Sequence, residues 1–185
     1  AAERPTSDPV SRQGPRLDGF LVIEHVPHTE ALGYEVLIGF REDPAFGPVL
    51  TVSKGGDDAE FFAAHYDPAN LFLPPMGYDE ALAFTRSLHI RHKYEQTGCL
   101  ECLDLMARAI ERMSALASAY SPGARGARWV FSSFEVNPFA IARDGRFVAL
   151  DGLAEFRAAD SGDHAVRVPV VTGLDAFFRP KGVAV

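Results

Sequence analysis

The stretch that decides the fold is residues 134–151, which read FEVNPFAIARDGRFVALD. An apolar run lies on each side of Asp144-Gly145, and an Asp-Gly pair between two such runs is a strong β-hairpin signal. Asn137 precedes the first run and Asp151 follows the second. A hairpin centred on the Asp-Gly pair therefore folds these two polar residues back towards each other.

The length of the hairpin loop decides whether the two side chains meet. A two-residue loop would oppose two arginines and would put Asn137 and Asp151 on opposite faces of the sheet. A three-residue loop instead pairs Ala142 with Arg146, and Gly145 takes the left-handed position that closes a bulge. We choose the three-residue loop, which sets Asn137 directly across from Asp151 on the same face.

Three oxygen-bearing side chains then share one face of the hairpin, because Glu135 lies two residues before Asn137 on its strand. Directly opposed Cβ atoms are about 4.5–5.5 Å apart, and two ligands at about 2.0–2.1 Å from one Mg²⁺ can bridge that gap. Magnesium held by few carboxylates usually arrives with substrate phosphates. This interpretation predicts a nucleotide-binding element. The alternative is an ordinary β-turn after a strand that ends at Pro138, a residue that often marks an edge or bulge.

Composition limits the class of protein. The 185 residues suffice for one domain with a core. The net charge of −7 and the lack of a Lys/Arg run argue against a nucleic-acid binder. No apolar stretch approaches membrane-spanning length, and the first twenty residues show no secretory signal. We therefore expect a cytoplasmic protein that binds neither nucleic acid nor membrane.

The two cysteines, Cys99 and Cys102, form a C-x-x-C spacing. A zinc or redox role would need a second pair or a βαβ context, and neither is present. An apolar stripe predicts an amphipathic helix over residues 100–120, with Thr97 as its cap. We interpret the cysteines as ordinary small residues of its first turn.

The remaining pattern indicates an α+β fold, a mostly antiparallel sheet covered by helices on one face. Strands are predicted at residues 20–26, 34–41, 49–53 and 129–136, followed by the hairpin. Helices are predicted from Asp57 or Asp58 to residue 65, from a cap at Asp79 to residue 92, and over residues 100–120. A short helix at 174–178 and a strand at 182–185 follow a polar loop at 158–168.

Separate motifs, in a specific order and spacing, resemble one known family. They lie at residues 33–39 (GYEVLIG) leading into 43–49 (DPAFGPV), 55–60 (GGDDAE), 135–138 (EVNP) and 149–151 (ALD). Together they resemble the C-terminal half of the ATP-grasp domain of the nucleoside-diphosphate-forming acyl-CoA synthetases. Succinyl-CoA synthetase and ADP-forming acetyl-CoA synthetase belong to that family. The resemblance runs from about Gly19 to Phe156.

The resemblance implies a set of binding residues for ATP and Mg²⁺. Asn137 and Asp151 match the family's magnesium-binding positions, with Glu135 beside them. Glu35 is similar to the acid that contacts the ribose hydroxyls. The other implied nucleotide contacts are the hinge segment Val22, Ile23, Glu24 and His25, whose backbone meets the adenine, and the glycine pair Gly55 and Gly56. No catalytic residue is expected in this piece.

The chain departs from the family pattern in two places, and Lys54 is a further candidate contact. Ser53 stands where many relatives have glycine, and the segment between Glu24 and Glu35 is long. Lys54 suggests a phosphate contact, although a lone lysine beside a loop is more often a solvated charge.

The resemblance also implies a domain plan. Residues 1–17 are a linker or tail, 18–158 the C-terminal lobe of an ATP-grasp domain, 159–172 a linker, and 173–185 the truncated start of a CoA-binding domain. The implied reaction converts a carboxylic acid, CoA and ATP into acyl-CoA, ADP and phosphate. The acid and CoA would bind through the rest of the enzyme, and the isolated chain is expected to be inactive.

Two other functions stay open at this point. One is another ATP-grasp carboxylate ligase. The other is a non-catalytic, regulatory nucleotide-binding module that keeps the fold without turnover. The face that the missing lobe would cover could also pair with a second copy of the chain, so a homo-oligomer is possible.

Overall fold

The computed structural model describes residues 18–57, 59, 70–124 and 126–160. Within these residues the chain forms a six-stranded sheet in which every pairing is antiparallel. The strand order is β3-β2-β1-β4-β5, and β6 also pairs with β4. The strands are β1 (Glu35–Asp43), β2 (Gly47–Lys54), β3 (Leu71–Phe72), β4 (Trp129–Ile141), β5 (Phe147–Ala149) and β6 (Gly152–Ala158).

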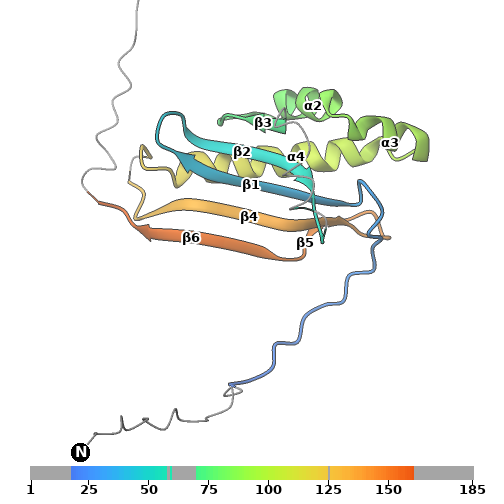
Figure 1. Cartoon of the computed structure of the whole chain (residues 1–185), viewed down its shortest axis with the longest axis horizontal. Coiled ribbons are helices and arrows are strands. Elements are labelled where there is room, and N and C mark those ends of the chain that lie inside the picture. Colours follow the sequence, from blue (N-terminus) through green and yellow to red (C-terminus); the bar gives the residue numbers. More distant parts are fainter. Residues whose placement is uncertain (1–17, 58, 60–69, 125, 161–185) are drawn as a thin grey trace, which may run out of the picture.

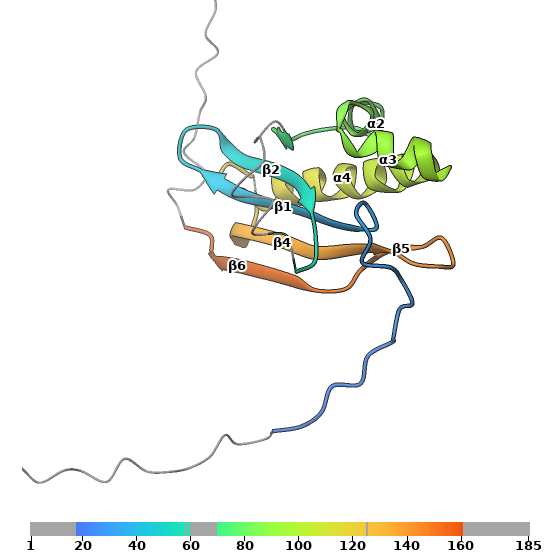
Figure 2. The same cartoon turned by 45° about the vertical axis from the view of Figure 1, so that its right-hand side comes forward.

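Among the described residues, three helices lie on one side of this sheet, and no described helix covers the other side (Figure 1). Figure 2 shows the same layering from a second direction, with α4 against the sheet and α2 outside it. The helices are α2 (Tyr78–Ser87), α3 (Ile90–Thr97) and α4 (Glu101–Ala119). The expected α+β fold, a mostly antiparallel sheet with helices on one face, is confirmed.

The hydrophobic core lies between α4 and the covered face of the sheet. Alternate residues of β1 point into it, since Val36, Ile38 and Phe40 are each at most 4% exposed. From α4 the apolar stripe supplies Met106 and Ile110, both almost completely buried. The residues between the buried positions of β1 therefore face the uncovered side.

The strand predicted over residues 20–26 is absent. Phe20, Leu21, Val22 and Ile23 are 73–92% exposed, and this segment runs away from the domain (Figure 1). An apolar run becomes a strand only where a neighbouring strand offers an edge, and both edges of β1 are taken by β2 and β4. The segment first meets the described sheet at the isolated bridge between His28 and Ala142.

The helix predicted from Asp79 to residue 92 is two helices. Gly77 is the N-cap of the first of them, α2, and the carboxylate of Glu80 accepts a hydrogen bond from the Gly77 N–H. α2 ends at its C-cap Leu88, where the backbone becomes extended (ψ 144°) and the chain turns. The Leu88 side chain is buried, at 6% exposed. Burial of this leucine outweighs continuation of the helix, and α3 starts two residues later. Thr97, predicted as the cap of α4, is instead the last residue of α3.

Cys99 and Cys102 form a disulfide, so their interpretation as ordinary helix residues is wrong. The Cys102 N–H donates to the Cys99 carbonyl at 3.0 Å. This turn at the start of α4 brings the two Cα atoms to 5.6 Å, within the usual range for a disulfide. The helix predicted at 57/58–65, the loop from residue 161 on, and the elements at 174–178 and 182–185 lie outside the described residues or almost entirely so.

Candidate functional site

The hairpin between β4 and β5 has a three-residue loop, as predicted. The Ala142 N–H donates to the Arg146 carbonyl at 2.8 Å, and the Gly145 N–H donates to the Ala142 carbonyl at 3.0 Å. Gly145 has φ 85°, the left-handed conformation that closes this type of loop. The Asp144 carboxylate accepts hydrogen bonds from the Arg146 backbone N–H and from Nε. These contacts fix the register of everything that follows.

That register puts Asn137 directly opposite Asp151. The Leu150 N–H donates to the Pro138 carbonyl, and the Asn137 N–H donates to the Asp151 carbonyl, both at 3.0 Å. The ladder continues into β6, where Glu135 pairs with Leu153. Directly opposed residues of an antiparallel ladder project to the same face. The predicted register is therefore confirmed.

The face on which Glu135 lies is the one that the helices leave uncovered. Glu135 also pairs with Gly39 of β1, which lies between the core positions Ile38 and Phe40. Because side chains alternate along a strand, Gly39 and its partner Glu135 are on the opposite face from the core. Within the part of the chain that the structure describes, this face of the sheet carries amide and carboxylate oxygens and has no layer of helices above it.

The Asn137 side chain joins the hairpin to the turn after β2. Its Oδ1 atom accepts a hydrogen bond from the Gly56 N–H at 2.9 Å. The Gly55 N–H in turn donates to the Glu35 carbonyl at 3.0 Å. A carbonyl oxygen has two lone pairs, so Oδ1 retains one acceptor site beyond the Gly56 bond. The predicted glycine pair, Glu35 and Asn137 are thus brought together from three strands.

Both glycines of the pair are needed for this approach. A Cβ on Gly55 would lie 2.8 Å from the Val36 carbonyl carbon and 2.9 Å from the Pro138 Cβ. Gly56 has φ 73°, and a Cβ there would overlap the Glu35 carboxylate. The backbone at Gly56 can pass beside Glu35 only without a side chain.

Glu35 is a buried carboxylate, 8% exposed. One of its oxygens, Oε1, lies 3.3 Å from His28 Nε2, and the other, Oε2, lies 4.0 Å from Lys54 Nζ. Lys54 Nζ also donates to the Gly55 carbonyl at 2.7 Å. The Lys54 side chain is only 9% exposed, so the expectation of a solvated charge is wrong. A buried carboxylate of this kind is tolerable because cations surround it.

His28 has an acceptor at each ring nitrogen. Nδ1 lies 2.8 Å from the Val26 carbonyl oxygen, and Nε2 faces the Glu35 carboxylate. Both contacts are hydrogen bonds only when both ring nitrogens carry protons, which is the imidazolium form. The bond to the Val26 carbonyl, followed by those to Glu35, raises the pKa of His28 above its ordinary value.

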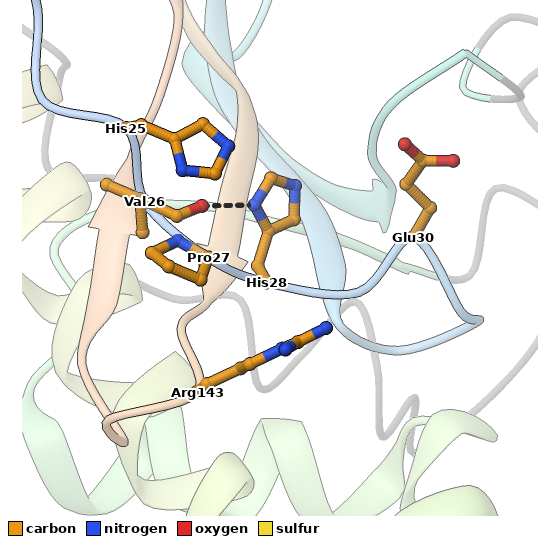
Figure 3. A pocket seen from close by; sticks show the side chains of 6 residues that line it. All are labelled: His25, Val26, Pro27, His28, Glu30 and Arg143. Carbon is orange, nitrogen blue, oxygen red and sulfur yellow. Dashed lines mark hydrogen bonds between the residues drawn. The ribbon is translucent and has the colours of Figure 1, made fainter.

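Of the four hinge residues predicted to meet a nucleotide, Glu24 and His25 lie beside the hairpin tip, whereas Val22 and Ile23 do not. Glu24 accepts a hydrogen bond from Arg146 Nη2 at 2.9 Å. A pocket of about 390 Å³ opens between the hinge segment and the hairpin (Figure 3); it is lined by His25, Val26, Pro27, His28, Glu30 and Arg143. Ile23, at 73% exposed, is not brought into this group.

The predicted metal ligands suit a hard cation by type. An amide oxygen and two carboxylates, from Asn137, Asp151 and Glu135, are the donor set that Mg²⁺ prefers, and waters or phosphates complete its shell. Asp151 is exposed, and its Oδ1 accepts a hydrogen bond from the Gly152 N–H. In the described part of the chain no group of three or more His, Cys, Asp and Glu side chains could hold a metal ion. Any such site therefore depends on the asparagine.

Reasoning from sequence missed one residue of this site, His28, and named Lys54 as a candidate phosphate contact without predicting its burial. Lys54 is the last residue of β2 and directly precedes the glycine pair, which was the available signal. His28 lies in the long segment between Glu24 and Glu35 and carried no motif. Its role follows only from the fold, which brings it against Glu35.

Comparisons with known proteins identify the family and the fold of the chain. Residues 7–154 match the sequence model of the family described as "ATP-grasp domain". No curated protein matches the chain. In the described residues, no helix has the length and apolar character needed to cross a membrane.

Two solved structures share the fold. One is "Crystal structure of PH1788 from Pyrococcus horikoshii Ot3", with TM-score 0.52, 19% identity, and coverage of 73% of this chain and 51% of that chain. The other is the dinucleotide forming acetyl-coenzyme A synthetase 1 of Ca. Korarchaeum cryptofilum in complex with coenzyme A and Mg-AMPPCP. It has TM-score 0.51, 18% identity, and coverage of 68% of this chain and 54% of that chain. The matched region therefore spans about half the length of each structure.

Proposed function

The chain belongs to the ATP-grasp family, and on that premise we propose that it supplies the metal-binding wall of an Mg-ATP site in an acyl-CoA synthetase. The enzyme would be a nucleoside-diphosphate-forming acid–CoA ligase. It would convert a carboxylic acid, CoA and ATP into acyl-CoA, ADP and phosphate. The observation that carries the proposal is the opposition of Asn137 and Asp151, with the Asn137 amide bonded to Gly56.

Each part of the site has a role in this proposal. Bound Mg²⁺ would neutralise charge on the phosphates during transfer. Asn137, Asp151 and Glu135 would hold the ion on the uncovered face. Gly55 and Gly56 would let the backbone lie close to the nucleotide, and Glu35 would contact the ribose hydroxyls. Glu24, His25 and Ile23 would present their backbone to the adenine, and the described residues would supply neither base nor nucleophile.

The domain plan is part of the same proposal. Residues 18–158 would be one lobe of the clamp, with 1–17 and 159–172 as linkers and 173–185 as the start of a CoA-binding domain. CoA and the acid would bind elsewhere in the enzyme. A second lobe, or a second copy of the chain, would close over the uncovered face.

A regulatory nucleotide-binding module is the second candidate. The observation that favours it is the state of Glu35, whose two oxygens already face His28 and Lys54. A ribose would have to compete with these cations for the carboxylate. Another ATP-grasp carboxylate ligase would use the same metal wall and would differ in its acceptor.

The test is substitution of Asp151 in the complete enzyme. Asp151→Ala is expected to lower turnover with CoA, acid and MgATP by about 10²-fold or more, because charge stabilisation at the phosphates is lost. Asp160→Ala removes another exposed carboxylate beyond β6 and is the matched control, expected to keep turnover. Circular dichroism checks that both variants fold. Equal turnover in Asp151→Ala and the parent would refute the metal assignment, and a substrate panel lacking activity with CoA would favour the other functions.

A further inference from the structure

The disulfide between Cys99 and Cys102 has no part in the proposed nucleotide site. These are the only two cysteines in the sequence, and they lie at the joint between α3 and α4. Cys102 is 1% exposed, whereas Cys99 is only partly buried at the edge of the core. One residue of the disulfide is therefore partly exposed and the other is buried.

The joint is built so that Cys99 contributes to both helices. Gly98 ends α3, and the Cys99 N–H donates to the Tyr94 carbonyl at 2.9 Å. The Cys99 carbonyl accepts from the Cys102 N–H in the first turn of α4. The disulfide thus adds a covalent cross-link beside these two hydrogen bonds.

The third helix in turn holds the chain that leads into Glu35. Tyr94 is completely buried, and its hydroxyl donates to the Gly33 carbonyl at 2.5 Å. Ile90, also on α3, packs against Gly33 together with Tyr94. Glu35, the first residue of β1, follows Gly33 by two residues. A loosened α3 would therefore loosen the turn before Glu35.

We propose that Cys99 and Cys102 form a reversible thiol–disulfide exchange site, whose reaction partner is a dithiol reductant. In the oxidised state the disulfide braces α3 against α4 and keeps the turn before Glu35 in place. In the reduced state this brace is lost. Where disulfides occur in reducing compartments, they are usually catalytic or redox-sensing, which fits a single C-x-x-C pair in a chain with a sufficient core.

The direction of the thiol–disulfide exchange follows from the different exposure of Cys99 and Cys102. A thiolate of the dithiol attacks the Sγ of the partly exposed Cys99, the bond between Cys99 and Cys102 breaks, and Cys102 leaves as a thiolate. It leaves in the first turn of α4, where the helix N-terminus favours negative charge, and then takes a proton. The second thiol of the reductant attacks its own sulfur in the mixed disulfide and releases Cys99. Two electrons and two protons pass to the protein, and the reductant becomes a disulfide.

The chemistry is tested by counting free thiols. The protein is equilibrated with buffers of reduced and oxidised dithiothreitol, quenched with acid and alkylated, and the labels are counted by intact mass. Zero labels in oxidising buffers and two in reducing buffers, with a smooth transition between them, are expected. Two labels at every ratio, or none at every ratio, would overturn the proposal.

The assigned direction of attack has its own test. With oxidised glutathione, Cys102→Ala should form a mixed disulfide on Cys99 at least about tenfold faster than Cys99→Ala forms one on the buried Cys102. Equal rates would contradict the assignment of Cys99 as the attacked sulfur. Each variant is the matched control of the other, because each retains one thiol.

The brace is tested by hydrogen exchange followed by mass spectrometry. Peptides covering residues 29–36 should exchange faster in the reduced protein than in the oxidised protein, while the hairpin peptide 142–150 keeps its rate. The double variant Cys99→Ser/Cys102→Ser should show the fast pattern in both buffers. Equal protection of 29–36 in both states would overturn the brace. None of these measurements uses nucleotide, so their failure is distinct from failure of the proposed function.

Discussion

At the scale of single residues, the contact between His28 and Glu35 makes stability depend on pH. The pKa of His28 is raised by its bonds to the Val26 carbonyl and to Glu35. A group whose pKa is higher in the folded protein than in the unfolded chain stabilises the fold. For His28 this contribution is complete below the pKa of the unfolded chain, 6.5, and is lost as the pH rises through the pKa of the folded protein. The groups near the ring are Glu35, Glu30 and, in the same pocket, His25 and Arg143.

We therefore expect the free energy of unfolding to fall as pH rises from 6 towards 8 (a window set by the ordinary histidine value, about 6.5). Urea denaturation across this range measures it. His28→Gln should flatten the fall, whereas His92→Gln should keep it; His92 also faces a carboxylate, Glu95, but on the exposed surface of α3. An unchanged slope in His28→Gln would contradict the imidazolium assignment.

Gly56 gives a second prediction at this scale. Its φ of 73° strains any other residue, and a Cβ would also meet the Glu35 carboxylate. Gly126 has nearly the same φ, 75°, with nothing within 4 Å of the added atom. Gly126→Ala should therefore cost only the strain of the left-handed conformation, about 1–2 kcal/mol. Gly56→Ala should lower the free energy of unfolding by clearly more. Equal losses in the two variants, measured by chemical denaturation, would show that the Glu35 side chain moves aside at no cost in stability.

How far the sequence predicts the site can be argued from individual residues. The Asp-Gly turn and its loop length follow from local backbone preferences, so the opposition of Asn137 and Asp151 was predictable. The pairing of Gly56 with Asn137 depends on β1 lying between β2 and β4, which no local pattern contains. His28 and the burial of Lys54 belong to the same class of long-range contact and were missed.

At the scale of elements, the strands and α4 were predictable because each buries one face. The alternation in β1 and the stripe of α4 are visible in the sequence. The errors arose where tertiary contacts outweigh local preference. Leu88 breaks a helical pattern to enter the core. Residues 20–23 have strand-like composition without a paired neighbour, and β3 has only two residues, too few to leave a pattern.

The hold of α3 on the turn before β1 gives a prediction at this scale. Tyr94→Phe removes a buried hydroxyl and leaves the Gly33 carbonyl without that donor. We expect a loss of about 1–3 kcal/mol in the free energy of unfolding, the cost of an unsatisfied buried acceptor. Tyr120→Phe is the control, since Tyr120 is 36% exposed and water can replace its bonds. Equal effects in thermal denaturation of the two variants would argue against α3 as an anchor.

At the scale of the whole molecule, large apolar side chains remain on the surface. Phe20, Leu21, Val22 and Ile23 project from the extended segment. On β4 and β6 the exposed ones are Trp129, Leu153 and Phe156. Clusters of exposed apolar side chains are typical of surfaces that contact another protein part. Together with the uncovered face that carries Glu135, these side chains support a site completed by a second lobe or a second copy.

In the proposed function this chain supplies one wall of the nucleotide site, and one wall alone should bind weakly, which gives the last prediction. Isothermal titration of MgATP into this chain alone is expected to give a dissociation constant weaker than about 10⁻⁴ M, because one wall supplies few of the contacts and pays the full cost of association. The complete enzyme should bind in the usual micromolar to millimolar range of substrates, about 1 μM–1 mM, and at least tenfold more tightly than the chain. Titration with ATP in EDTA is the control, since the wall proposed here acts through the metal. Micromolar binding by the chain alone would mean that these residues form a complete site, and the uncovered face would then need another explanation.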